Sequence, residues 1–287
     1  MIKNFIVPID FSDDSIKGLD IAALFSTKTS VNIQMVYIQK RVSENFPNET
    51  REEYNSANDK LEKLVAAYSP KLGNDSKLRY IIKKGPKVYK EIVEQVESYK
   101  GGLISMSTHG ASGFEELFIG SNALRIISAT TRPVITIRKC GVPSDIKKIV
   151  MPIDNMPETR QKVPMTAEIA RLFGAEIHVI EVSSSHNARV LQRLKGYSKQ
   201  VCAYLQEHNI PHLTQTVFGD NVADITVDYA NKIGADMISI ITEQNNTLTN
   251  LIVGNFAQRV LNTACIPVLN ITPNEIKIKD SFNTYGE

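Results

Sequence analysis

The sequence predicts an α/β fold made of two tandem domains, each a five-stranded parallel sheet with helices on both faces. Two observations carry this prediction. The chain repeats itself, because the apolar run that ends in Pro8-Ile9-Asp10 returns as a run ending in Pro152-Ile153-Asp154. Within each copy, short apolar runs alternate with helical patterns, which is typical of a parallel sheet covered on both sides. A length of 287 residues also suits two domains of ordinary size.

Further segments recur in the same order and define the two copies. Residues 31–37 resemble 175–181, residues 103–106 resemble 237–240, residues 118–122 resemble 252–256, and residues 132–135 resemble 266–269. A short turn-forming stretch at 139–144 separates the copies. We therefore expect a first domain over 1–140, a second over 145–273, and a polar C-terminal tail over 274–287.

The first copy allows each element to be placed. Its apolar runs predict strands near 4–9, 31–38, 78–84, 102–107 and 133–138. Its helical patterns predict helices near 13–27, 50–68, 86–99 and 120–129, with Asp13 or Asp14 capping the first and Ser121 capping the fourth. Helix 50–68 is also predicted to carry an apolar stripe, formed by Tyr54, Ala57, Leu61, Leu64 and Val65.

Composition narrows the classes of function. The formal net charge is +2 and 22% of the residues are charged, without the strong basic excess that nucleic-acid binding would require. No run approaches the roughly 20 apolar residues of a membrane span. The N-terminal segment MIKNFIVPIDFSDDS lacks an apolar core of signal-peptide length. These features predict a cytoplasmic protein that binds neither nucleic acid nor membrane.

The candidate site lies where two predicted strands end. Asp10 ends the first strand, and Ser107 to Gly110 follow the fourth. In an open parallel sheet, ligands bind beyond the carboxyl ends of the strands, where the strand order reverses. Gly120-Ser121-Asn122 would offer N–H groups and a hydroxyl at a helix N-terminus, which is a phosphate site without Lys or Arg. The same residues also fit a loop that binds nothing, and local chemistry leaves both interpretations open.

The chain resembles the universal stress protein family in its tandem form, over residues 1 to 272. ATP-binding members carry Gly-x2-Gly-x9-Gly-[Ser/Thr] after the fourth strand, together with an aspartate after the first. The first half reads Ser107-x2-Gly110-x9-Gly120-Ser121, with Asp10 in place. The spacing is intact, but Ser107 replaces the first glycine, and its Cβ either crowds the ligand or is tolerated.

The resemblance implies a Rossmann-like, adenine nucleotide alpha-hydrolase-like fold that binds ATP or a related nucleotide, with Mg²⁺ as an accompanying ion. It places Asp10 and the backbone near Ile9 at the ribose and adenine, Tyr37 near the base, and the 110–122 segment at the phosphates. The implied nucleotide-binding residues are Pro8, Ile9, Asp10, Tyr37, Met106, Ser107, Gly110, Gly113, Gly120, Ser121 and Asn122. No catalytic residue or protein metal ligand is assigned, although Glu115 and Glu116 suit either Mg²⁺ or a solvated helix start.

The second half departs further from the motif. It reads Ile241-x2-Gln244-x9-Gly254-Asn255, so side chains replace both early glycines while Asp154 and Gly254 remain. We therefore expect nucleotide binding in the first half and its loss in the second.

Three functions compete at this point. The first is a nucleotide-binding regulatory protein of a stress response. The second is a weak ATPase, for which no catalytic base is visible; His109 fits a loop residue better. The third is a module that binds no nucleotide and acts through another small ligand or a protein partner. Family members usually pair their fifth strands, so strands 133–138 and 266–271 are expected to form a pseudo-dimer within the chain, and two chains could form a homodimer.

Overall fold

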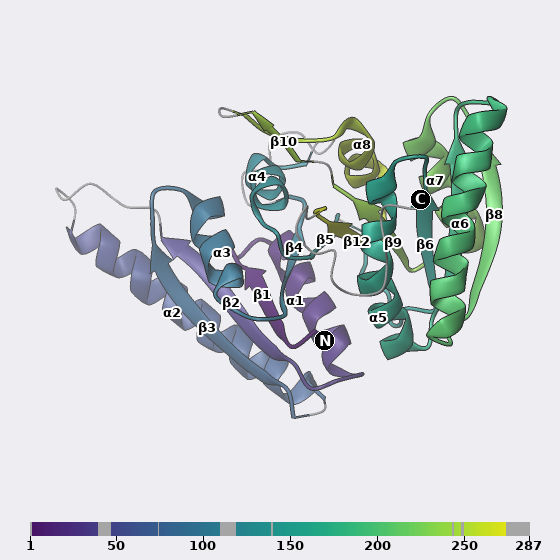
Figure 1. Cartoon of the computed structure of the whole chain (residues 1–287). Coiled ribbons are helices and arrows are strands. Elements are labelled where there is room, and N and C mark those ends of the chain that lie inside the picture. The colour runs from purple at the N-terminus through teal and green to yellow at the C-terminus, as the bar shows by residue number, and fades with distance from the viewer. Residues whose placement is uncertain are drawn as a thin grey trace. The chain divides into compact units, whose positions relative to one another are not determined.

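The computed structural model describes residues 2–39, 47–73, 75–109, 119–138, 140–242, 244–247 and 250–273. The chain divides into two compact units, Met1–Val142 and Pro143–Glu287 (Figure 1). The predicted tail 274–287 lies outside the described residues. Over the described ranges, no helix is both long enough and apolar enough to cross a bilayer.

The first unit is a parallel sheet of five strands in the order β3-β2-β1-β4-β5. Its elements follow one another as β1 (Asn4–Pro8), α1 (Asp13–Ser26), β2 (Asn32–Gln39), α2 (Pro47–Tyr68), a 3₁₀ turn η1 (Ser69–Lys71), β3 (Lys77–Lys84), α3 (Val88–Glu97), β4 (Gly102–Ser107), α4 (Ser121–Ala129) and β5 (Val134–Ile137). The prediction of alternating strands and helices is confirmed.

The second unit repeats this arrangement in the order β12-β9-β6-β7-β8, again with parallel pairing. Its elements are β6 (Lys148–Ile153), η2 (Pro157–Lys162), α5 (Val163–Phe173), β7 (Glu176–Ser183), α6 (Ala188–Glu207), β8 (His212–Phe218), α7 (Val222–Ile233), β9 (Met237–Ile241), β10 (Gln244–Thr247), β11 (Asn250–Val253), α8 (Asn255–Thr263) and β12 (Val268–Ile271). The antiparallel pair β10–β11 follows β9 and was not expected from the sequence.

Burial explains why these segments form strands. Every residue of β4 is buried, and Phe5, Ile6 and Val7 of β1 have no exposed surface. Strands buried on both faces read as continuous apolar runs, as these do. Right-handed crossovers in this strand order place α1 and α2 on one face and α3 and α4 on the other, where α3 packs against α4.

Two expected helix caps are corrected by the structure. Ser12, not Asp13 or Asp14, caps α1, and its Oγ accepts the N–H of Ser15 at 3.1 Å. Gly120, not Ser121, is the N-cap of α4, so Ser121 is the first helical residue.

The apolar stripe predicted for helix 50–68 is only partly right. Ala57 and Leu61 are buried, but Tyr54 is 42% exposed. A spacing of three or four residues places Tyr54 on the same side of α2 as Ala57, but the covered part of the helix does not extend to it.

The matching start of the first helix is packed differently in the two units. Gly18 of α1 lies so close to β4 that a Cβ there would stand 2.7 Å from the carbonyl oxygen of Ser105 and 2.9 Å from Cα of Met106. The matching position of the second unit is Lys162, at the end of η2. Its side chain is buried, and its Nζ donates to the carbonyl oxygen and to Oγ1 of Thr159 at 2.6 and 3.0 Å.

We predict that Gly18→Ala destabilises the protein by about 1–3 kcal/mol, because helix and strand must separate to admit the methyl group. Gly196 of α6 is the matched control, since it is exposed and a Cβ there meets nothing within 4 Å. Gly196→Ala should stabilise by about 0.5–1 kcal/mol through helix propensity. Urea unfolding of both variants measures the difference. A Gly18→Ala variant as stable as Gly196→Ala would contradict the prediction, because α1 and β4 would then have room for the methyl group.

Burial lowers the pKa of Lys162 to about 7 from its ordinary 10.5, against the opposing attraction of Asp154. The unfolded chain then binds more protons than the folded one between these values, so wild-type stability gains from rising pH in that window. We predict that the Lys162→Met variant is more stable than the wild type at pH 7. The difference between their free energies of unfolding should shrink towards pH 10 by up to about 1.4 kcal/mol per pH unit. Urea unfolding of both proteins at intervals of one pH unit tests this. A lead that does not change with pH contradicts it.

Candidate functional site

The ladder between β1 and β4 ends before either strand does. The two strands pair at Asn4 with Gly102, Phe5 with Leu103 and Ile6 with Ile104, and then pairing stops. Successive residues of a strand direct their N–H groups to opposite neighbours, and Ile9 donates to Val36 of β2 at 2.9 Å. Pro8 therefore faces β4, where it has no N–H to give. A crevice can open beyond this point, at the reversal of strand order.

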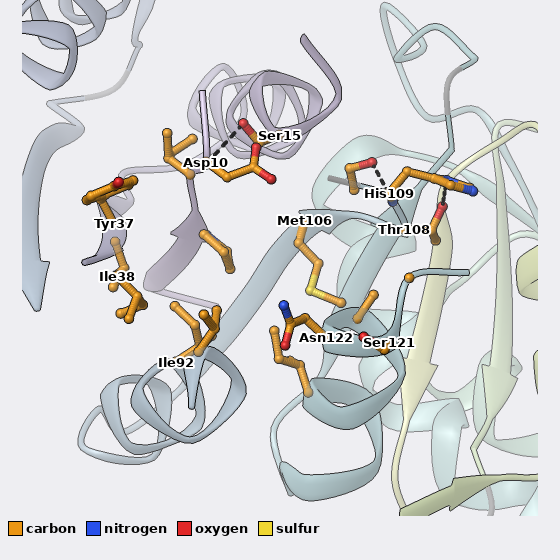
Figure 2. A pocket seen from close by; sticks show the side chains of 18 of the residues that line it. Asp10, Ser15, Tyr37, Ile38, Ile92, Met106, Thr108, His109, Ser121 and Asn122 are labelled. Carbon is orange, nitrogen blue, oxygen red and sulfur yellow. Dashed lines mark hydrogen bonds between the residues drawn. The ribbon is translucent and has the colours of Figure 1, made fainter. Parts of the chain in front are cut away.

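A cavity of about 440 Å³ occupies this crevice in the first unit (Figure 2). This volume falls within the range of about 300–1,000 Å³ that is typical of small-molecule sites. Its walls come from the ends of β1, β2 and β4, from α2 and α3, and from the start of α4. The lining residues are Pro8, Ile9, Asp10, Ser15, Val36, Tyr37, Ile38, Glu53, Val88, Ile92, Met106, Ser107, Thr108, His109, Gly120, Ser121, Asn122, Ala123 and Ile126.

Asp10 is exposed at the cavity and held by a tight turn. Its Oδ1 accepts the backbone N–H of Ser12 at 3.0 Å and the Ser12 hydroxyl at 2.5 Å. Its own N–H donates to Ser15 Oγ at 3.4 Å. Phe11, between them, takes φ +66°, a left-handed conformation that costs a non-glycine residue energy. The turn fixes the direction of the carboxylate.

The second unit keeps two hydrogen bonds of this turn at Asp154. Oδ1 of Asp154 accepts the N–H of Met156 at 2.8 Å, and the N–H of Asp154 donates to Thr159 Oγ1 at 3.4 Å. The repeated Pro-Ile-Asp sequence therefore encodes the same pair of aspartate hydrogen bonds twice, although Asn155 does not take the left-handed conformation of Phe11.

The loop after β4 is tied to both β5 and α4. The N–H of Thr108 donates to Ile137 of β5 at 2.9 Å, and the carbonyl of Thr108 accepts the N–H of Gly120 at 2.8 Å. A Cβ at Gly120 would stand 3.2 Å from that carbonyl oxygen, so the close approach favours glycine. Ser107 Oγ accepts the N–H of His109 at 3.1 Å.

The N-terminus of α4 meets the cavity, since Ser121, Asn122 and Ala123 line it. Gly120 precedes them as N-cap, and among the described residues no side chain caps this end. The first N–H groups of a helix have no intrahelical acceptor and carry the positive end of its dipole. This end of the cavity therefore suits an anion.

The opposite end carries a carboxylate that the sequence did not single out. Glu53 of α2 accepts the Tyr37 hydroxyl at 2.8 Å through Oε1 and the Gln39 amide at 3.1 Å through Oε2. Burial, reinforced by the hydrogen bond to Glu53, raises the pKa of Tyr37 to about 12. Glu53 sits in a polar stretch of α2, TREEYNSAND, where nothing in the sequence distinguishes it from its exposed neighbours.

The charges of the cavity are acidic. Its described lining includes Asp10 and Glu53 but neither lysine nor arginine. Over the described ranges, no three His, Cys, Asp or Glu residues gather as they would around a metal ion. Any anionic group of a ligand would therefore depend on backbone N–H groups, hydroxyls or an ion that it brings with it.

Nine of the eleven residues expected from the sequence line this cavity: Pro8, Ile9, Asp10, Tyr37, Met106, Ser107, Gly120, Ser121 and Asn122. The other two, Gly110 and Gly113, lie outside the described residues, as do Ser112, Glu115 and Glu116. That these residues bind a nucleotide stays a prediction. His109, expected to be a simple loop residue, is half-buried in the lining, with Nδ1 2.9 Å from Thr108 Oγ1.

The matching region of the second unit is built differently. Gln244 begins β10, while Gly254 caps α8 with φ −56° and ψ 150°, close to the −62° and 145° of Gly120. Arg160 is fully buried, with its guanidinium 4.1 Å from the ring of Tyr197, and Lys162 is buried beside it in η2. The helix cap is kept, but two large cationic side chains are buried near the Asp154 turn, where the described part of the first unit has none.

Comparisons with known proteins agree with this architecture. The pattern of the Universal stress protein family matches residues 1–138 and again 145–271. No curated protein matches the chain. A crystal structure of a universal stress protein from Archaeoglobus fulgidus DSM 4304 is similar over 94% of this chain and 98% of that one, with 18% identity and a TM-score of 0.74.

A second structure, of a putative universal stress protein from Pseudomonas aeruginosa UCBPP-PA14, is similar over 95% of this chain and 94% of that one. Its identity is 19% and its TM-score is 0.66. At this level of identity the structures establish a common fold over both units, and the family match, made twice, covers most of the sequence. The chain therefore belongs to the universal stress protein family, in its tandem two-domain form.

Proposed function

We propose that this chain is a nucleotide-binding regulatory protein of a stress response, whose first unit binds ATP or a related adenine nucleotide together with Mg²⁺. Binding would favour one arrangement of the 107–121 segment, and so change a surface that a partner recognises. Pairing of the two fifth strands, a homodimer and a cytoplasmic location stay predictions within this proposal.

The observation that carries the proposal is the cavity where β1 and β4 part. It has the volume of a small-molecule site, the Asp10 carboxylate at its edge, and the N-terminus of α4 at one end. A carboxylate is a good acceptor for ribose hydroxyls, and a helix N-terminus suits phosphate oxygens. Because the described lining has no cation, a nucleotide with its own Mg²⁺ fits better than the free polyanion.

One contact favours a second candidate, a module that binds a ligand other than ATP. The Ser107 hydroxyl accepts the N–H of His109 at 3.1 Å. This N–H lies in the loop that would face phosphates, and Ser107 occupies it. A site weakened in this way would serve a less anionic ligand, or none. A measurement of affinity decides between the two candidates.

The second unit is proposed to bind no nucleotide. Its Asp154 turn and Gly254 cap resemble those of the first unit. Arg160 and Lys162 are buried close to the turn, and β10 replaces the start of the glycine loop. Both changes are expected to leave less room for a ligand beside the Asp154 turn, and this is the reason for expecting no binding there.

We expect calorimetric titration of the full chain to show ATP binding at one site, tighter with Mg²⁺ than with EDTA. Gly120→Val should weaken binding at least tenfold, since its side chain enters the gap between Thr108 and the first turn of α4. Gly254→Val, the same change at the matching cap, is the control and should leave the affinity unchanged.

Circular dichroism melts must show that both variants fold. Crosslinking with azido-ATP, followed by peptide mapping, locates the site independently. A flat titration of the wild type would overturn the proposal and favour the second candidate. Labelling mainly within 237–262 would place the site in the second unit and contradict its assignment to the first.

The Ser107 contact leads to a separate expectation. Ser107→Gly restores the family glycine and releases the His109 N–H towards the ligand. Affinity for ATP should rise about 2- to 10-fold, the gain of one ordinary hydrogen bond. Ser107→Ala removes the hydroxyl but keeps the Cβ, so comparing the two variants by titration separates crowding from hydrogen bonding. Unchanged affinity in both would mean that Ser107 does not limit binding.

A further inference from the structure

Glu53 is fixed in place by two neighbouring side chains of β2. The Tyr37 hydroxyl donates to Oε1 at 2.8 Å, and the Gln39 amide donates to Oε2 at 3.1 Å. Gln39 has no exposed surface, so its amide is a rigid anchor. The ring of Phe11 packs against that of Tyr37, with centroids 5.0 Å apart. The carboxylate is therefore held by both oxygens, rather than moving freely on the surface of α2.

These contacts leave acceptor capacity on the side that faces the cavity. A carboxylate offers about four lone-pair sites, and the two protein donors use one on each oxygen. Glu53 lines the cavity, so a ligand atom beside it must be a donor or must leave the charge unsatisfied. The Tyr37 hydroxyl stays protonated at neutral pH and already donates to Glu53, so the remaining lone pairs of Glu53 still need a donor from the ligand.

The position of Glu53 shows which part of a ligand it meets. Figure 2 shows Tyr37 and Ile38 on one side of the cavity and Ser121 and Asn122 on the other. The helix N-terminus at Ser121 suits the anionic group of a ligand, whereas Glu53 repels it. A nucleotide would thus lie with its phosphates at α4 and its base at the Tyr37–Glu53 pair.

We propose that Glu53 determines base specificity by accepting a hydrogen bond from an exocyclic amine, which for an adenine nucleotide is the 6-amino group. This inference rests on the proposed function, and it assigns to α2 a role that the glycine motif does not contain. A ligand without the amine leaves a half-buried carboxylate facing an apolar C–H. A ligand with it makes a charge-assisted hydrogen bond.

The test compares ATP with purine riboside 5′-triphosphate, which lacks only the 6-amino group, by calorimetric titration with Mg²⁺. Wild-type protein should bind ATP about 10- to 100-fold more tightly, as expected for one hydrogen bond to a charged group. Glu53→Gln keeps the shape but removes the charge, so the ratio of the two affinities should fall at least threefold. Glu52→Gln makes the same charge change on an exposed neighbour and should keep the wild-type ratio.

The ratio separates a direct contact from a structural role. A Glu53→Gln variant that merely loosens Tyr37 and Gln39 would weaken both ligands equally and leave the ratio unchanged, which would overturn the inference. Equal binding of the two ligands by the wild type would also overturn it, while the proposed function would stand. Failure of both ligands to bind the wild type would remove the proposed function itself.

Discussion

The candidate site depends on a missing hydrogen-bond donor. Pro8 faces β4 at the point where the β1–β4 ladder ends, while Ile9 still donates to β2. The sheet thus stays closed on one side of β1 and opens on the other. The second unit repeats the device, because Pro152 lies past the last β6–β9 pair at Val150. The reversal of strand order allows the opening, and a residue without an N–H stands where it begins.

The two units share a backbone framework but differ in the side chains buried beside it. Both keep the proline, the aspartate turn and a glycine cap on the helix after the fourth strand. They differ in the first helix, where Gly18 lets α1 press on β4 and Lys162 instead carries a long side chain into the interior. The same position therefore serves close packing of helix on strand in one unit and holds a buried lysine in the other.

Much of the fold could be predicted because periodicity reports burial. The fourth strand was expected over 102–107 and is found as Gly102–Ser107, since it is buried throughout and its residues are mostly apolar or small. Helix caps were less predictable, because Ser12, Asp13 and Asp14 are all good capping residues and only the turn at Asp10 selects Ser12. Glu53 could not be found, because a glutamate on a polar helix has no sequence signal of what lies across from it.

The charges of the cavity bear on what it can hold. Asp10 and Glu53 make it acidic, and the described lining includes no basic side chain to offset them. A polyanion bound there is best placed near an uncapped helix N-terminus, such as the start of α4, because the positive end of the helix dipole offsets its charge. The same carboxylates favour donors elsewhere on the ligand, so they suit a molecule with an anionic end, hydroxyl groups and an amine far from the anionic end. An adenine nucleotide presents its groups in that order, so the charges of the cavity support the proposed function independently of the glycine motif.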